Sequence, residues 1–138
     1  MRITSKPILL VEDDVVDAMT VRRALKELHV TNHLEHQENG EDALAYLRGP
    51  ACLRPCIILL DLNMPIMSGI EFLKIIKFDN ALRRIPVIVL TTSAEQDDKD
   101  ASFDQGVAGY MRKPVDYKQF VETIRAIDAY WTISELPE

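Results

Sequence analysis

Short apolar segments alternate along the chain with stretches of helical spacing, and this alternation restricts the fold more than any other feature of the sequence. The apolar segments span residues 8–11, 33–37, 56–60, 87–90 and 107–111. Three of them are continuously apolar, as strands covered on both faces must be. Parallel strands also need a crossover between them, which a helix supplies. We therefore expect an α/β fold, with five parallel strands and helices on both faces of the sheet.

The intervening segments carry apolar residues on one helical face. The clearest stripe comprises Tyr117, Phe120, Ile124, Ile127 and Trp131, and a second comprises Ala18, Val21, Leu25 and Leu28. Asn39-Gly40 and Gly49-Pro50 bracket a further helix. Ser93 and Gln96 have the spacing of a capping box, and Gly106 is placed to end the helix that this box begins.

Length and charge limit the classes of function. We expect the 138 residues to form one domain, with a core over about residues 6–130, a C-terminal tail over 131–138 and no attached DNA-binding domain. The 16 basic and 22 acidic residues give a net charge of −6, which repels phosphate backbones and anionic membranes. The longest apolar run is far shorter than the roughly 20 residues of a membrane span. We expect a cytoplasmic protein that binds neither nucleic acid nor membranes.

The cysteines and histidines do not have the spacing of a zinc site. Cys52 and Cys56 form one pair, with His29, His33 and His36 upstream, whereas structural zinc sites show tighter, repeated pairs. We interpret both cysteines as reduced thiols, with Cys56 at the start of a buried strand and Cys52 in the preceding loop.

Polar side chains gather at the carboxyl ends of the expected strands. They are Glu12, Asp13 and Asp14 after the first segment, Asp61 after the third, Thr91 and Thr92 after the fourth, and Arg112 and Lys113 after the fifth. The carboxyl ends of parallel strands share one edge, where such folds bind ligands. Carboxylates that converge there repel one another, and a divalent cation such as Mg²⁺ relieves the repulsion. Taken alone, the acidic run after the first segment is typical of a solvated turn.

Asp61 is placed to act as a nucleophile. It follows the apolar run 58–60, so its carboxylate is expected to emerge at the rim of the sheet. A carboxylate that attacks a phosphoryl group forms an acyl phosphate, and neighbouring groups neutralise the phosphoryl oxygens. Thr91 and Lys113 suit that task, although Lys113 would also serve as a structural cation among the acidic residues.

Five motifs, taken in order, resemble the receiver domain of two-component response regulators. They are Glu12-Asp13, Asp61-Leu62-Asn63-Met64-Pro65 with Gly69, Thr91, Gly109-Tyr110 and Lys113-Pro114. The resemblance covers about residues 6–130. It implies the flavodoxin-like (CheY-like) arrangement, a five-stranded parallel sheet with strand order 2-1-3-4-5.

The resemblance also implies how the acidic residues act. Asp61 would be the phosphoacceptor, Asp13 a direct Mg²⁺ ligand, and Glu12 a second acid that reaches the ion through water. Asn63 would offer its backbone carbonyl to the ion. From the residues alone, the metal pair could also be Asp13 and Asp14. We prefer Glu12 with Asp13 because the resemblance places the pair directly after the apolar run.

The remaining matches concern the phosphoryl group and the response to it. Thr91 and Lys113 would each bind a phosphoryl oxygen, and a cis bond between Lys113 and Pro114 would aim the ammonium into the site. Tyr110 would change rotamer as Thr91 moves, or it is an amphipathic ring at a strand edge. Thr92 stands where the family often has a smaller residue, which bears on access to the phosphoryl group.

We expect a stand-alone response regulator that receives a phosphoryl group on Asp61 from a sensor histidine kinase or a phosphotransfer protein, changes shape and signals to a downstream protein. It modifies only itself, so we do not class it as an enzyme. Residues 48–55 and 130–137 are similar to those of the small regulators that partner phytochrome-type histidine kinases.

Three alternatives stay open. A receiver-like module that is not phosphorylated would not need the complete acceptor set. An aspartate-nucleophile phosphatase needs a general acid near its nucleophile, commonly two residues on, where Asn63 cannot donate a proton. A flavin-binding protein of this fold would carry a phosphate-cradling loop after the first strand, where Glu12, Asp13 and Asp14 repel phosphate.

Apolar residues near the carboxyl end suggest a contact surface. Val121, Tyr130, Ile133 and Leu136 lie beyond the stripe that covers the sheet. We expect a homodimer through the fourth helix, fifth strand and fifth helix, with the tail taking part. The charges that would set its register are Asp97, Asp98, Lys99 and Asp100 opposite Arg112 and Lys118. In the alternative, the tail folds back over its own domain.

Overall fold

The computed structural model describes residues 6–50 and 53–133, in which five strands form one parallel sheet. The strands are β1 (Ile8–Val11), β2 (Leu34–Gln37), β3 (Ile57–Leu60), β4 (Val87–Thr91) and β5 (Gly109–Arg112). Their order is β2-β1-β3-β4-β5, and every neighbouring pair is parallel. The expected fold and the strand order are confirmed.

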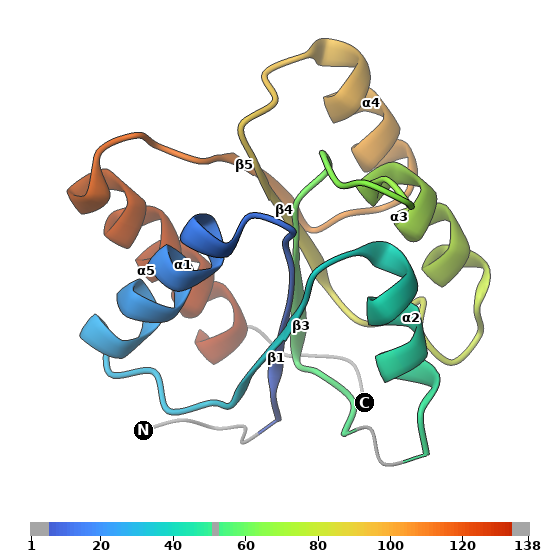
Figure 1. Cartoon of the computed structure of the whole chain (residues 1–138), viewed down its shortest axis with the longest axis horizontal. Helices are drawn as coiled ribbons and strands as arrows, with labels where there is room; N and C mark the ends of the chain where they lie inside the picture. The colour runs from blue at the N-terminus through green and yellow to red at the C-terminus, as the bar shows by residue number, and fades with distance from the viewer. Residues whose placement is uncertain (1–5, 51–52, 134–138) are drawn as a thin grey trace.

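Helices cover both faces of the sheet (Figure 1). Two of them, α1 (Val15–Glu27) and α5 (Tyr117–Ile133), pack on one face, and α2 (Gly40–Arg48) and α3 (Gly69–Phe78) pack on the other, with α4 (Gln96–Asp104) beside α3. Successive side chains of a strand point to opposite faces. Ile8 and Leu10 accordingly join the core under α1 and α5, whereas Leu9 and Val11 join the core under α2 and α3.

Burial on both faces explains the continuous apolar runs. Every residue of β1, β3 and β4 is buried. The edge strands β2 and β5 are mostly half-buried, which accounts for the weaker apolar pattern of their sequences.

The expected ends of α2 and α4 are confirmed in part. The side chain of Asn39 accepts a hydrogen bond from the backbone N–H of Asp42 and caps α2, which ends at Arg48 with Gly49 as its C-terminal cap. Gly106 follows α4 with a φ of 76°, a left-handed conformation that glycine adopts without strain.

The capping box expected at Ser93 and Gln96 is wrong. Helix α4 begins only at Gln96, and the Ser93 hydroxyl instead donates to the carboxylate of Asp98. A capping box does begin α3, where the side chain of Ser68 accepts from the backbone of Glu71 and the Glu71 carboxylate accepts from the backbone of Ser68.

The apolar surface expected beyond the stripe of α5 is also wrong for Val121, which is 4% exposed within the core. Tyr130 packs against the same core, and Trp131 is fully buried. The buried face of α5 is wider than one row of residues because the helix packs against both the sheet and α1. The side chain of Ile133 and all of Leu136 lie outside the described residues.

Cys56 is buried immediately before β3, and Cys52 lies outside the described residues. Within the part of the chain that the structure describes, no group of three His, Cys, Asp or Glu ligands includes a histidine or a cysteine. None of the described helices is long and apolar enough to cross a membrane.

Candidate functional site

The acidic residues meet at the carboxyl edge of the sheet. Backbone hydrogen bonds extend the strand ladders past β1 and β3: the N–H of Glu12 donates to Gln37 over 3.0 Å, and the N–H of Asp61 donates to Val11 over 3.0 Å. The side chains of both acids are therefore held by rigid backbone at the rim. Both residues are buried, with Glu12 1% exposed and Asp61 6% exposed.

Glu12, Asp13 and Asp61 form an acidic pocket suited to a divalent cation. One carboxylate oxygen from each residue lies within 4.8 Å of the others. Hard oxygen ligands at this spacing fit Mg²⁺, which binds through one or two carboxylates and keeps several waters. The carboxylate of Asp14 is turned away, since it caps α1 by accepting from the N–H groups of Val16 and Asp17. The structure thus brings together the preferred pair and not the alternative with Asp14.

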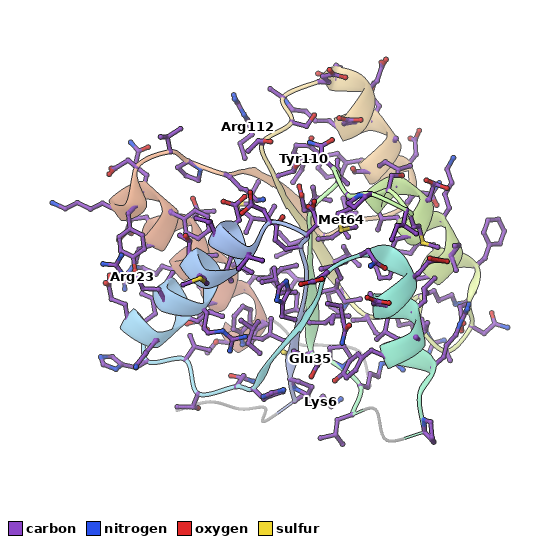
Figure 2. The ribbon with its side chains drawn as sticks, in the orientation of Figure 1. Lys6, Arg23, Glu35, Met64, Tyr110 and Arg112 are labelled. Atoms are coloured by element: carbon purple, nitrogen blue, oxygen red, sulfur yellow. The ribbon has the colours of Figure 1, made fainter. Side chains whose placement is uncertain are left out.

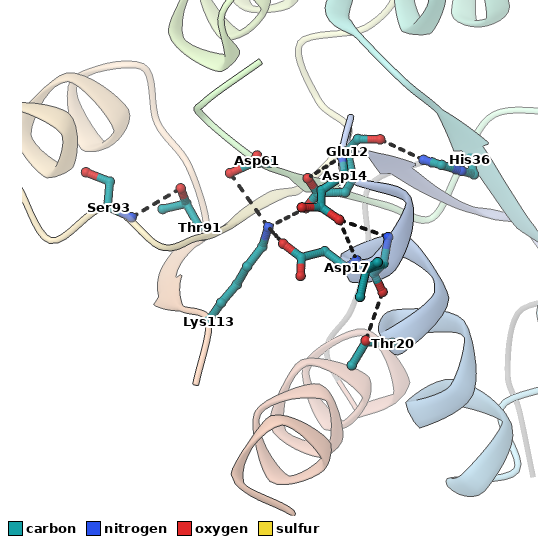
Figure 3. Close-up of polar contacts among 10 residues, drawn as sticks. Glu12, Asp14, Asp17, Thr20, His36, Asp61, Thr91, Ser93 and Lys113 are labelled. Atoms are coloured by element: carbon teal, nitrogen blue, oxygen red, sulfur yellow. Dashed lines mark hydrogen bonds and ion pairs between the residues drawn. The ribbon is translucent and has the colours of Figure 1, made fainter. Parts of the chain in front are cut away.

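Lys113 reaches this pocket from the end of β5 (Figure 3). Its backbone N–H donates to the carbonyl of Thr91 over 2.8 Å, which extends the ladder between β4 and β5. Its Nζ contacts the carboxylate of Glu12 and lies 3.9 Å from Oδ1 of Asp61. The expected cis bond between Lys113 and Pro114 is wrong, because every peptide bond among the described residues is trans. The trans form is the lower-energy isomer, and the long lysine side chain enters the site from it.

Asp17 is a residue of this site that the sequence reasoning missed. Its Oδ2 lies 2.8 Å from Nζ of Lys113. Asp17 comes three residues after the helix cap Asp14, where an acidic residue is ordinary because it favours the helix dipole. That position was the available signal, and it indicates a helix start rather than a contact with a strand end 96 residues away.

Burial and charge shift the two central groups. Burial raises the pKa of Glu12 to about 7, and the charge of Asp61 adds to this, whereas Lys113 opposes it. Burial by itself would lower the pKa of Lys113, but its hydrogen bonds to Asp17 and Glu12 outweigh burial and raise that pKa. Lys113 is therefore held as a cation among carboxylates.

Thr91 and Thr92 at the end of β4 have different surroundings. Thr91 is fully buried, and its Oγ1 accepts a long hydrogen bond of 3.4 Å from the N–H of Ser93. Thr92 is exposed and lines a cavity of about 470 Å³ together with Lys113. Thr92 therefore lies beside the approach to the lysine.

Tyr110 connects β5 to the loop after β4. Its ring is half-buried against the core under α2 and α3 (Figure 2), and its hydroxyl donates to the carbonyl of Ser93 over 3.0 Å. Ser93 in turn donates to Asp98 of α4. Tyr110 and Ser93 together thus link β5, the loop after β4 and α4.

The segment after Asp61 turns tightly. The N–H of Gly69 donates to the carbonyl of Leu62, and a Cβ on Gly69 would lie 2.5 Å from the carbonyl oxygen of Asp61. Only glycine permits this approach of α3 to the acceptor loop. Asn63 is exposed two residues after Asp61.

Comparison with known sequences supports this geometry. A sequence model described as the response regulator receiver domain matches residues 8–125. The probable methanogenesis regulatory protein FilR2 of Methanothrix harundinacea is 40% identical over 127 residues, which cover 90% of this chain and 82% of FilR2. The response regulator Rcp1 of Synechocystis sp. is 38% identical over 130 residues, which cover 91% of this chain and 88% of Rcp1.

Solved structures agree. The phosphorylated cyanobacterial phytochrome response regulator RcpA superposes with a TM-score of 0.91 at 38% identity, covering 98% of this chain and 100% of RcpA. The Mn²⁺-bound form of Rcp1 gives a TM-score of 0.88 at 38% identity, covering 96% of this chain and 99% of the other. With the strand order, the acidic pocket and these matches together, the chain belongs to the response regulator receiver domain family.

Proposed function

We propose that Asp61 accepts a phosphoryl group from a sensor histidine kinase or a phosphotransfer protein, and that the modified chain signals by protein contact. One observation carries this proposal: the carboxylates of Glu12, Asp13 and Asp61 meet at the sheet edge, with the ammonium of Lys113 beside them. A buried nucleophile, a cation site and a fixed positive charge are what phosphoryl transfer needs.

The reaction follows from these positions. A carboxylate oxygen of Asp61 forms a bond to phosphorus while the phosphorus–nitrogen bond of the donor phosphohistidine breaks, and the electron pair returns to the imidazole. Glu12, Asp13, Asp61 and the backbone carbonyl of Asn63 would hold Mg²⁺, which when bound supplies positive charge next to the phosphoryl oxygens. Lys113 and the hydroxyl of Thr91 each bind a further phosphoryl oxygen.

The response to phosphorylation runs through Thr91 and Tyr110. Movement of Thr91 toward the phosphoryl group displaces the segment that Tyr110 holds through the Ser93 carbonyl. Because Ser93 is bonded to Asp98, the displacement reaches α4.

The proposed kinase partner is of the phytochrome type. RcpA is described as a phytochrome response regulator, and its similarity extends over nearly the whole of both chains. Three apolar side chains are exposed on α1, namely Val15 at 56%, Val16 at 70% and Met19 at 64%. Of these, Val16 lines the same cavity as Lys113. Apolar side chains at the rim of the acceptor site suit contact with a donor protein.

The decisive experiment uses acetyl phosphate as a small donor. Wild type should gain one phosphoryl adduct by intact mass spectrometry in the presence of Mg²⁺ and none with EDTA. Asp61→Asn should gain none, whereas Asp104→Asn, which alters an exposed acid at the end of α4, should label like wild type. An equal adduct on Asp61→Asn would refute the assignment.

A further inference from the structure

The ammonium of Lys113 is shared among three carboxylates, and the two closer ones are not on the proposed acceptor (Figure 3). Nζ contacts Glu12, lies 2.8 Å from Oδ2 of Asp17, and is 3.9 Å from Oδ1 of Asp61. The lysine side chain is 6% exposed, so these contacts are made largely out of water. In this state the ammonium is held on the α1 side of the site.

The geometry points to Asp17 as a positioning residue that holds Lys113 away from Asp61 until a phosphoryl oxygen competes for the ammonium. This inference rests on the proposed function of Asp61 as phosphoacceptor. Asp17 itself touches neither the phosphoryl group nor the cation in this scheme, because it acts through Lys113.

The charge balance gives Asp17 a second effect. Glu12 and Asp61 belong to the acidic pocket, whereas Asp17 is outside it. Without the Asp17 carboxylate, the remaining anionic partners of Lys113 are the residues that would hold Mg²⁺. The ammonium would then compete with the divalent cation for those carboxylates. Asp17 therefore favours cation binding and opposes phosphoryl binding.

These opposite signs separate positioning from a structural role. Asp17 is also at the start of α1, where its backbone N–H is capped by Asp14. If Asp17 only stabilised the helix, its loss would weaken the binding of both ligands or of neither. Asp14 provides the matched control, since it lies in the same turn and its carboxylate accepts from the N–H groups of Val16 and Asp17, whereas Lys113 pairs with Glu12, Asp17 and Asp61 within the described part of the chain. Asp14→Asn removes one charge and keeps a good helix cap.

The experiment compares the full chain as wild type, Asp17→Asn and Asp14→Asn by isothermal titration calorimetry. Mg²⁺ is titrated first, and beryllofluoride, a mimic of the phosphoryl group, is titrated next at saturating Mg²⁺. We expect Asp17→Asn to weaken the affinity for Mg²⁺ about 5-fold and to strengthen the affinity for beryllofluoride about 5-fold, because one partly screened charge is removed. Asp14→Asn should stay within about 2-fold of wild type for both ligands.

Two further variants keep the test decisive. Asp17→Glu, which restores the charge, should return both affinities toward wild type, and Asp17→Ala replaces Asp17→Asn if the latter does not fold. Loss of both affinities in Asp17→Asn, or values that match those of Asp14→Asn, would overturn the role of Asp17 while wild type still binds beryllofluoride. If wild type itself neither binds beryllofluoride nor labels with acetyl phosphate, the proposed function fails and this inference fails with it.

Discussion

Gly69 shows how a single residue determines the shape of the acceptor loop. A Cβ there would lie 2.5 Å from the carbonyl oxygen of Asp61 and 2.7 Å from Cα of Leu62, and both atoms belong to backbone that cannot move aside cheaply. We expect Gly69→Ala to destabilise the fold by about 1–3 kcal/mol and to slow labelling of Asp61, because the acceptor loop must shift.

Urea denaturation and acetyl phosphate labelling measure the two effects of Gly69→Ala. Gly109→Ala is the control, since its Cβ would meet only Ile88 at 3.8 Å, an ordinary contact. Equal stability for Gly69→Ala and wild type would contradict the close approach.

Glu12 makes stability depend on pH in the metal-free protein. Burial raises its pKa from 4.5 to about 7, so the folded protein binds this proton more tightly than the unfolded chain. The contribution of Glu12 to stability is therefore fully present below pH 4.5 and is lost as the pH rises toward about 7. Lys113 stays charged over this range because its own pKa is raised.

The measurement is urea denaturation in EDTA across this window, for wild type and Glu12→Gln. We expect the free energy of unfolding of wild type, relative to Glu12→Gln, to fall as the pH rises. Glutamine is neutral at every pH and so provides the reference. A difference that is constant or rises with pH would show that the Glu12 proton is not retained by the folded state.

At the scale of elements, the sequence predicted strands better than helix starts. A strand buried on both faces leaves a continuous apolar run, which is visible without any partner, as in β3. A helix cap depends on where the backbone turns: Ser93 and Ser68 both have a glutamate or glutamine three residues on, yet only Ser68 caps a helix. Ser93 instead donates a hydrogen bond to Asp98, and the spacing of residues in the sequence does not predict this partner.

The link between β5 and α4 gives a prediction at this scale. Tyr110→Phe removes the hydrogen bond to the Ser93 carbonyl, which is worth about 0.5–1.5 kcal/mol, and frees the loop after β4. We expect faster hydrogen exchange over residues 92–104. Tyr117→Phe removes a hydrogen bond from α5 to Glu27 of α1 and should leave that exchange unchanged. If Tyr110→Phe also leaves it unchanged, the ring is only an amphipathic side chain at a strand edge.

At the scale of the molecule, the site is predictable as far as topology determines it. Parallel strands bring Glu12, Asp61 and Lys113 to one edge, so the sequence sufficed to place them together. Asp17 joins them through a contact between the first turn of α1 and the side chain of Lys113, 96 residues away, which no local sequence pattern encodes. Val121 was misjudged for a related reason, because its burial depends on how α5 packs against α1.

We propose that the molecule forms a homodimer through α4, β5 and α5. Val121 and Tyr130 pack in the core, so they do not support this proposal. The support now comes from charge and from one apolar side chain. Asp97 and Asp100 make α4 acidic, Arg112 and Lys118 are exposed cations on β5 and α5, and Phe103 of α4 is 55% exposed. A self-complementary face of this kind suits two-fold symmetry.

Sedimentation velocity at micromolar concentration tests the homodimer on the full chain and on a truncation after Ile133. This truncation retains Trp131, which is fully buried, so the fold keeps its core. We expect the full chain to sediment as a species of twice the monomer mass. Substitution of Arg112 and Lys118 by aspartate should shift the equilibrium toward monomer at low salt, because several ion pairs at the rim act together where one alone is worth little. If the truncation is monomeric while the full chain is dimeric, the tail takes part as expected. A full chain that is monomeric with and without phosphorylation would contradict the dimer, and the acidic surface of α4 would then be available to a different protein.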